Sequence, residues 1–323
     1  MNNVTDNVRC PIVEAECIRA RPLLGTVVEI AARGPEADTV RSAVEQAFQV
    51  VEEVHRLMSY HDPNSDVSRI NREAAARPVA VALHTWRVLR AAHKFSLASD
   101  GLFDITVAPT LVALGFLPRH ADFPRASGQG DWRHVELYAG RRVRLARRLR
   151  IDLGGIAKGY AVDCAIQILK VRGMHAARVN AGGDLRVFGS QVQTIHVRRP
   201  CAPRELLPLI QLAEGAVATS ASYFSARRHG GQRVSPLIQP RTRTSCPCKC
   251  SVSVLAPDCM TADALTKVVH ADSQQAAVIL PRFQARALIL EQEDASAMCK
   301  LYDSIGAKEK IWQVHWRPGV SIV

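Results

Sequence analysis

Apolar side chains recur along the chain with two periods, one typical of helices and one typical of strands. Over residues 36–58 they recur at every third or fourth position, which predicts a long amphipathic helix. The same period predicts a second helix over residues 83–98, which ends at Asp100-Gly101. Further helices are predicted to begin near Ile156 and to span residues 260–270.

Strands are predicted where short apolar runs end at turn-forming residues. They span residues 23–34, 140–150, 176–189, 193–199, 216–224, 250–257 and 285–292. In the second of these, arginines alternate with Val143 and Leu145, the pattern of a strand with one face in solvent. Residues 59–71 are dense in turn formers and are predicted as a polar loop. Runs of strands with interspersed helices favour an α+β layered domain over a regular βαβ array.

Length and composition are compatible with one large domain or two tightly joined lobes. The chain has 323 residues, 47% of them apolar and 22% charged, so a substantial core is expected. No apolar run approaches the roughly 20 residues that span a bilayer, and the charged first 25 residues do not resemble a secretory signal. Nine cysteines, an odd and mostly scattered set, favour free thiols in a reducing cytoplasm.

The net charge of +12 leaves several kinds of partner open. Arginines gather at 140–150 and 225–233. For the first run a solvated face is the simpler interpretation, and an anionic ligand or partner is the alternative. No helix-turn-helix, zinc-finger or RNA-recognition signature is present, so no nucleic-acid partner is expected.

The segment "IDLGGIAKG" (151–159) carries the most specific chemistry. Its glycines let the backbone approach a ligand closely, and the helix that follows directs N–H groups and partial positive charge toward it. Lys158 adds a formal cation, which suits a phosphate or pyrophosphate, while Asp152 suits a hydroxyl or a ring N–H. The segment matches neither a P-loop nor a dinucleotide fingerprint. Alone, it is also compatible with a glycine turn that only lets a strand and a helix pack.

Three other segments repeat this chemistry. "NAGGD" (180–184) places a second glycine pair and a carboxylate after a strand, and "VATS" (217–220) ends a strand in two hydroxyls. In "MTADALTKVV" (260–269), Asp263 is expected to cap or charge the start of a helix. It also lies three residues before Thr266 on one helical face, where both oxygens can reach one hard cation.

Taken as a set, these segments resemble the ApbE family, the FAD:protein FMN transferases. The resemblance covers most of the chain and keeps the order and spacing of the family. It runs through "LLGT", "MSYHDPNSDVSRIN", "SDGLFDITVAP", "IDLGGIAKGYAVD", "NAGGDLRVFG", "VATS" and "TADALT".

The resemblance implies an α+β fold with a T-fold-like core, antiparallel sheets and packed helices. It implies one FAD-binding transferase domain over residues 21–323, after an N-terminal extension over residues 1–20. Enzymes of this family cleave FAD, attach FMN to a Ser or Thr of an acceptor flavoprotein and release AMP, with Mg²⁺ on the pyrophosphate. The expected partners are therefore FAD and the acceptor flavoprotein. No nucleic-acid or membrane partner is expected, and the expected location is the cytoplasm.

The resemblance also implies roles for individual residues. It places FAD against Leu24, Tyr60, Leu102, Phe103, Asp104, Asp152 and Lys158. It implies that the Gly155 carbonyl and the Asp263 carboxylate bind Mg²⁺, and Thr266 completes the expected metal set.

The chain departs from the family pattern in two places. Where the family has a segment like "H-I-I-D-P-x-T-G", this chain has "SPLIQPRTR" (235–243), with Pro236, Gln239 and Arg243 in place of His, Asp and Gly. Proline cannot take a proton, so another base is expected to serve the acceptor hydroxyl if transfer occurs. Candidate catalytic residues are His229 and Asp263.

These changes leave a second hypothesis open, a catalytically impaired FAD-binding protein or slow FAD pyrophosphatase. A third is a basic adaptor protein that uses no flavin. Lys267 stands where the family has a Thr, and its side chain is expected either to point to solvent or to place its ammonium where a metal charge is otherwise needed.

"CPCKC" presents Cys246, Cys248 and Cys250 on one side of a strand-like run. Free cysteines at a strand start are the simpler interpretation. A soft-metal or redox site is the alternative.

Overall fold

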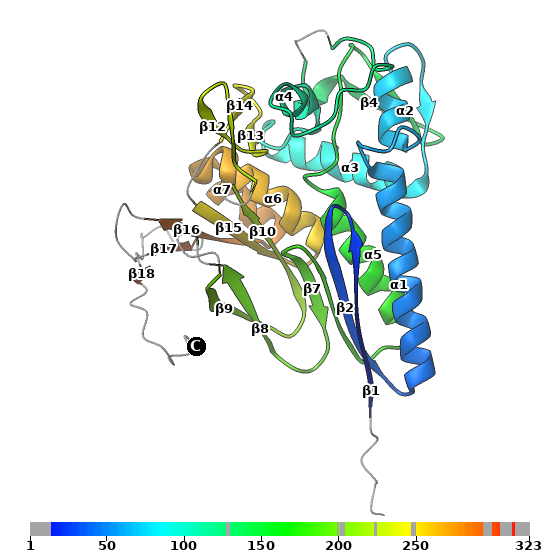
Figure 1. Cartoon of the computed structure of the whole chain (residues 1–323), viewed down its shortest axis with the longest axis vertical. Helices are drawn as coiled ribbons and strands as arrows, with labels where there is room; N and C mark the ends of the chain where they lie inside the picture. Colours follow the sequence, from blue (N-terminus) through cyan, green and yellow to red (C-terminus); the bar gives the residue numbers. More distant parts are fainter. Residues whose placement is uncertain are drawn as a thin grey trace, which may run out of the picture.

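In the part of the chain that the computed structural model describes, nine strands form one antiparallel sheet (Figure 1). The described residues are 14–126, 130–198, 200, 204–222, 225–246, 250–292, 299–303 and 312–313. In sheet order the strands are β1 (Ala15–Leu23), β2 (Thr26–Gly34), β6 (Ala176–Ala181), β7 (Asp184–Phe188), β10 (Gly215–Ala221), β15 (Cys250–Ala256), β16 (Arg286–Gln292), β17 (Cys299–Asp303) and β18 (Trp312–Gln313).

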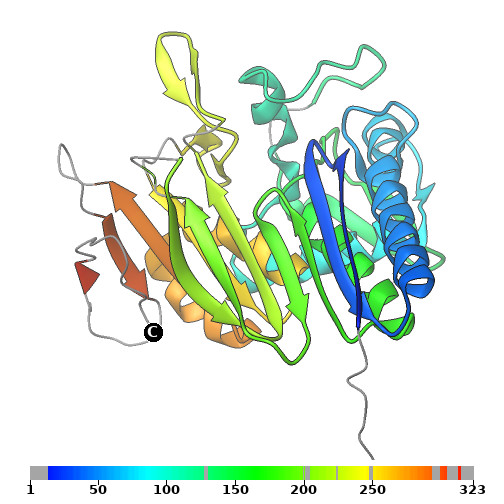
Figure 2. The same cartoon turned by 60° about the horizontal axis from the view of Figure 1, so that its bottom comes forward.

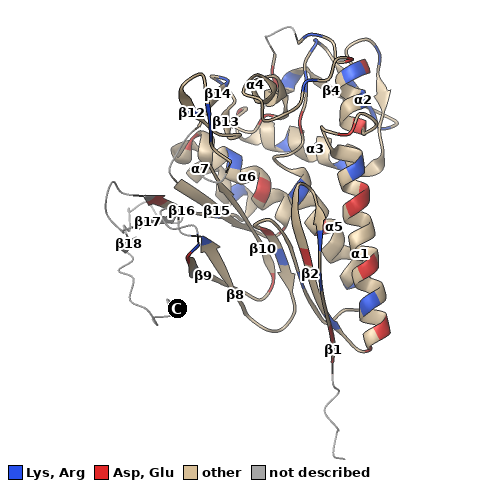
Figure 3. Ribbon diagram, viewed as in Figure 1, with Lys and Arg blue, Asp and Glu red and all other residues tan. Residues whose placement is uncertain are grey.

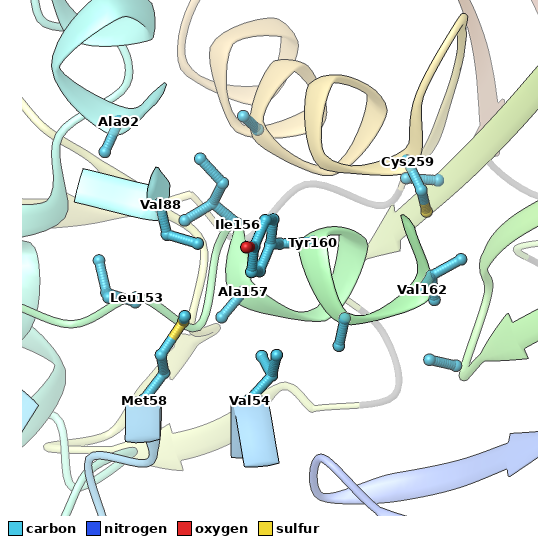
Figure 4. Packing of buried hydrophobic residues seen from close by; sticks show 14 of the residues in the cluster. Val54, Met58, Val88, Ala92, Leu153, Ile156, Ala157, Tyr160, Val162 and Cys259 are labelled. Atoms are coloured by element: carbon cyan, nitrogen blue, oxygen red, sulfur yellow. The ribbon is translucent and has the colours of Figure 1, made fainter. Parts of the chain in front are cut away.

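Three helices cover one face of this sheet, α1 (Ala37–Met58), α5 (Ala157–Val171) and α6 (Cys259–Ala271), as Figure 2 shows. The alternation along β2 explains the arrangement, because Val28 and Ile30 are buried beneath the helices while Glu29 points to the other face. Figure 4 shows side chains of α1, α3 (Leu83–Ala98) and α5 meeting in this core. Each large apolar side chain buried there contributes about 1.5–3 kcal/mol.

A smaller group of elements packs beside the sheet, at the top of Figure 1. It contains α2 (Asp66–Glu73), α3 (Leu83–Ala98), α4 (Ala108–Ala113) and the sheet β3 (Val79–Ala80), β5 (Arg142–Leu145) and β4 (Val135–Tyr138). The Asn71 side chain of α2 holds Ile151 at both backbone atoms, donating to its carbonyl at 2.9 Å and accepting from its N–H at 2.7 Å. This contact fixes the start of the glycine-containing segment.

The remaining elements are short. They are α7 (Ser273–Ile279), β8 (Gln193–Arg198), β9 (Leu206–Leu212), β11 (Arg227–His229), β12 (Gln232–Val234), β13 (Ile238–Gln239), β14 (Thr244–Ser245) and the 3-10 turns at Ile105–Val107, Trp132–His134 and Leu280–Phe283. β8–β9, β11–β12 and β13–β14 are antiparallel pairs.

The structure confirms the predicted α+β class and the antiparallel sheet with packed helices, and it corrects several local predictions. The loop predicted over 59–71 ends in α2, because Ser65 accepts a hydrogen bond from the Ser68 N–H at 3.0 Å and starts a short helix. The strand predicted over 176–189 is the hairpin β6–β7, which turns at Gly182 and Gly183 with positive φ.

Two other expectations concern the start of the chain and the cysteines. β1 begins at Ala15, so residues 15–20 of the predicted extension pair with β2 in the sheet. Cys250 is disulfide-bonded, so the expectation of free thiols is wrong for this residue, while Cys246 and Cys259 are free. Cys248 lies outside the described residues.

Lys and Arg residues are spread over several elements in Figure 3, with charges of both signs along α1. Among the helices that the structure describes, none has the length and apolar character needed to cross a membrane.

Candidate functional site

A cavity of about 1330 Å³ lies over the sheet face opposite α1 and continues to the start of α5. Glu29 of β2 and Arg178 of β6 line it from the sheet, at positions that alternate with buried core residues. The β8–β9 hairpin contributes His196, Arg198 and other side chains from a second side. The 102–107 loop and the β13–β14 region complete the wall.

The segment 152–158, which contains the glycine turn, lies at the wall of this cavity. Asp152 is held in place by its own N–H, which donates to the Ile105 carbonyl at 2.8 Å. Its carboxylate accepts the Gly154 N–H at 3.1 Å, and burial raises its pKa although this hydrogen bond opposes the effect. Asp152, Gly154, Gly155 and Lys158 all line the cavity.

Lys158 lies between two buried carboxylates. Its ammonium donates to the Asp184 carboxylate at the start of β7 and lies 3.9 Å from Asp263 Oδ2 on α6. Burial alone lowers the pKa of Lys158, but the two carboxylates outweigh it and raise that pKa above its usual value. The lysine is therefore a permanent cation at the cavity wall.

Asp263 is completely buried, and both of its oxygens are engaged. Oδ2 accepts the Gly159 N–H at 3.1 Å, and Oδ1 accepts the Lys267 ammonium. Burial raises the pKa of Asp263, but Lys158 and Lys267 outweigh it and hold that pKa below its usual value. Asp263 therefore stays ionised.

Lys267 points into the site and not to solvent. Besides the carboxylate, its Nζ donates to the Asp263 carbonyl oxygen at 3.2 Å and to Ser220 Oγ at 3.2 Å. A Cβ added at Gly155 would lie 3.4 Å from Lys267 Cε, so the lysine stem packs against the glycine turn.

These contacts test whether Mg²⁺ fits the expected ligands Gly155, Asp263 and Thr266. Thr266 Oγ1 is fully buried, donates to the Asp263 carbonyl at 2.7 Å and pairs with Ser220 Oγ at 2.8 Å. Both carboxylate oxygens of Asp263 are occupied as described above. Within the described residues, no group of three or more His, Cys, Asp or Glu side chains is arranged to hold a metal ion. The residues as they stand do not fit Mg²⁺ at this position.

The predicted flavin contacts divide into two groups. Leu102, Phe103 and Asp104 line the cavity. Leu24 lies in the β1–β2 turn, and Tyr60 is buried against the rings of His120 and Phe123; neither belongs to the lining.

His229, one of the two candidate bases, is exposed on the β11–β12 hairpin and is also outside the lining. The predicted site residues keep their roles in flavin binding and catalysis as predictions. This holds for residues inside the lining and for residues outside it.

The divergent segment 235–243 closes one side of the cavity. Pro236 lines it, and Gln239 Oε1 accepts the Thr242 N–H at 2.8 Å, which stabilises the turn. Arg243 has φ 57°, the left-handed conformation that favours glycine. Its guanidinium donates to Asp104 Oδ2 at 3.0 Å and to the Gly130 carbonyl at 2.8 Å, and these bonds hold the backbone there.

Several lining residues were not predicted from the sequence. They are Glu29, Arg178, His196, Arg198, Arg204 and His270. For Glu29 and Arg178, the only indication in the sequence is strand alternation, which directs both side chains to the sheet face opposite the buried core residues. For the residues of β8–β9, nothing in the sequence predicts that the hairpin folds over the sheet.

The fold and the cavity together define an α+β protein whose cavity is lined by fixed cations and a glycine turn. The model of the ApbE family matches residues 24–289, so the chain belongs to the ApbE family.

Curated relatives and solved structures agree with this assignment. The FAD:protein FMN transferase of Vibrio cholerae is 27% identical over 259 residues, covering 76% of this chain and 78% of that protein. The enzyme of the same name from Treponema pallidum is 27% identical over 279 residues, covering 77% of each chain. The crystal structure of the ApbE protein from Thermotoga maritima superposes with a TM-score of 0.75 at 29% identity, covering 85% of this chain and 94% of that one.

Proposed function

We propose that this protein is an FAD:protein FMN transferase, which attaches FMN from FAD to a Ser or Thr of an acceptor flavoprotein and releases AMP. The observation that supports this most is Lys158, a partly buried cation held by the buried carboxylates of Asp184 and Asp263 beside a glycine turn, in a cavity large enough for a dinucleotide. The names of the ApbE relatives support the flavin-transfer chemistry. A cytoplasmic location remains a prediction.

In the proposed reaction, the acceptor hydroxyl oxygen forms a bond to the FMN phosphorus. The bond from this phosphorus to the bridging oxygen breaks, AMP leaves with that oxygen, and the hydroxyl proton passes to a base. Phosphoryl transfer depends mainly on positioning and on neutralising the phosphate oxygens. Lys158 and Lys267 are the cations beside the glycine turn that would supply this charge, and Arg178, Arg198 and Arg204 line the same cavity.

The predicted base is His229 or Asp263. Asp263 is a poor proton acceptor because it is held ionised by two lysines and both its oxygens accept hydrogen bonds. His229 is therefore the first residue to replace, and its exposed position on a hairpin allows replacement without a cost to the core. We expect His229→Ala to slow transfer and to leave FAD binding unchanged.

The test combines the purified protein, FAD and a candidate acceptor flavoprotein from the same organism. Mass spectrometry of the acceptor is expected to show the added mass of FMN, and chromatography is expected to show one AMP per adduct. FAD that is bound but unchanged, or hydrolysed to FMN and AMP without an adduct, would contradict transfer and favour the impaired flavin-binding or pyrophosphatase alternative. Absence of FAD binding would favour the basic adaptor.

A further inference from the structure

We propose that the Lys267 ammonium is a built-in cation that replaces a divalent metal ion in this site, so that the protein binds and uses its flavin without a metal. The part of this inference that concerns FAD rests on the proposed function. The part that concerns metal binding rests on side-chain geometry alone.

Three oxygens of different kinds surround the Lys267 nitrogen. They are the Asp263 carboxylate, the Asp263 carbonyl at 3.2 Å and Ser220 Oγ at 3.2 Å. Carboxylate, carbonyl and hydroxyl oxygens are the ligands that hard cations take in proteins. An ammonium has three N–H donors and no acceptor, so it satisfies the same three oxygens with hydrogen bonds.

The oxygens come from two elements that meet at the cavity. Asp263 and Lys267 are one helical turn apart on α6, which also lets the side chains pair along the helix. Ser220 lies near the end of β10, and α6 packs against that strand. Acidic and basic residues both occur on α6, as Figure 3 shows. The cation is thus fixed between helix and sheet.

Lys158 and Lys267 balance the charge of the two carboxylates that they contact. The carboxylates of Asp184 and Asp263 face the ammonium groups of Lys158 and Lys267, two negative charges against two positive charges. In the absence of FAD, a divalent ion added to these four groups leaves an excess of positive charge, which disfavours metal binding to the free protein.

The space that a metal ion would need beside Gly155 and Asp263 is also occupied. The Lys267 stem packs against Gly155, whose carbonyl was expected to bind the metal, at 3.4 Å from a Cβ placed there. Thr266 directs its hydroxyl to the Asp263 carbonyl and to Ser220, not to the cavity. A metal ion can use these ligands only if Lys267 leaves.

The first test measures metal binding directly. EDTA-treated protein is titrated with Mn²⁺ and followed by electron paramagnetic resonance, with and without FAD, and FAD affinity is measured in EDTA and in Mg²⁺. We expect no stoichiometric Mn²⁺ binding in either state and FAD dissociation constants that agree within about twofold. One tightly bound Mn²⁺ per chain, or loss of FAD binding in EDTA, would overturn the proposal.

The second test replaces the cation. Lys267→Thr removes the ammonium and frees the Asp263 oxygens, and we expect it to bind one Mn²⁺ and to bind FAD about tenfold more tightly with Mg²⁺ than in EDTA. The control is Lys170→Thr on α5, which removes an exposed pair with Glu214. A folded Lys267→Thr protein that binds no Mn²⁺ would contradict the inference.

Failure of the proposed function is distinguishable from failure of this inference. If the wild-type protein binds neither FAD nor Mn²⁺, the transferase proposal fails. The proposal that the Lys267 ammonium occupies the metal position is then still supported. If Lys267→Thr does not fold, the wild-type titrations still decide the question.

Discussion

At the residue scale, His270 is kept neutral beside the cavity cations. Its Nε2–H donates to the Ser220 carbonyl oxygen at 3.1 Å. Burial lowers its pKa to about 4, and the positive charge of Lys267 acts in the same direction. A neutral imidazole adds no charge to a wall that already presents Lys158 and Lys267.

This pKa predicts a loss of stability in mild acid. An unfolded histidine has a pKa of 6.5, so below that value the unfolded chain binds a proton that the folded protein accepts only near pH 4. The stabilisation is complete above about pH 6.5 and is lost as the pH falls toward about 4. In the wild-type protein, the free energy of unfolding measured in urea is expected to fall by about 1–2 kcal/mol from about pH 7 to about pH 5. His270→Gln is expected to lack this fall. Equal losses in both proteins would contradict this account.

At the element scale, the close approach of α5 and α6 places Lys158 and Asp263 together. Gly159 permits it, because a Cβ at this position would lie 2.3 Å from the Cys259 carbonyl oxygen and 2.9 Å from Asp263 Cβ. Asp163 on α5 strengthens the contact, since its carboxylate accepts the N–H groups of Cys259 and Met260 at 2.9 and 2.8 Å.

Gly159→Ala is therefore expected to destabilise the protein by about 1–3 kcal/mol, through overpacking against backbone atoms. Helix propensity alone predicts the opposite sign, since Ala is favoured over Gly by about 1 kcal/mol in a helix. Gln167→Ala, at an exposed position of the same helix, is the control. Denaturant midpoints for the two variants measure the difference, and a Gly159→Ala protein as stable as the control would show that the helices are not in tight contact.

At the scale of the whole molecule, the sequence predicted the elements with long, regular patterns. The period in 36–58 and 83–98 predicted α1 and α3, because each buries one continuous face. The eight-residue α2 was missed since it is too short for a period to emerge within a polar segment. The glycine pair between β6 and β7 was noted in the sequence but not interpreted as a hairpin turn, because the residues on both sides of it continue a strand-like pattern.

The site was predictable where its residues are adjacent in the chain. Asp152 and Lys158 belong to one segment, and the structure brings both to the cavity. The surroundings of Lys267 were not predictable, because Ser220 lies 47 positions away and meets it only through the packing of α6 on β10. The sequence therefore left both orientations of this lysine open.

The most direct test of the account is the binding of FAD, measured by isothermal titration calorimetry. We expect one FAD per chain in the wild-type protein and affinity at least about tenfold weaker in Lys158→Met, because in the proposed function this lysine supplies fixed charge at the diphosphate. Lys170→Met, a change of the same kind at an exposed position of α5, is expected to bind like the wild type. Lys158→Arg keeps the charge if the Met variant does not fold. Absence of saturable FAD binding, or a folded Lys158→Met protein with wild-type affinity, would contradict the assignment of this cavity.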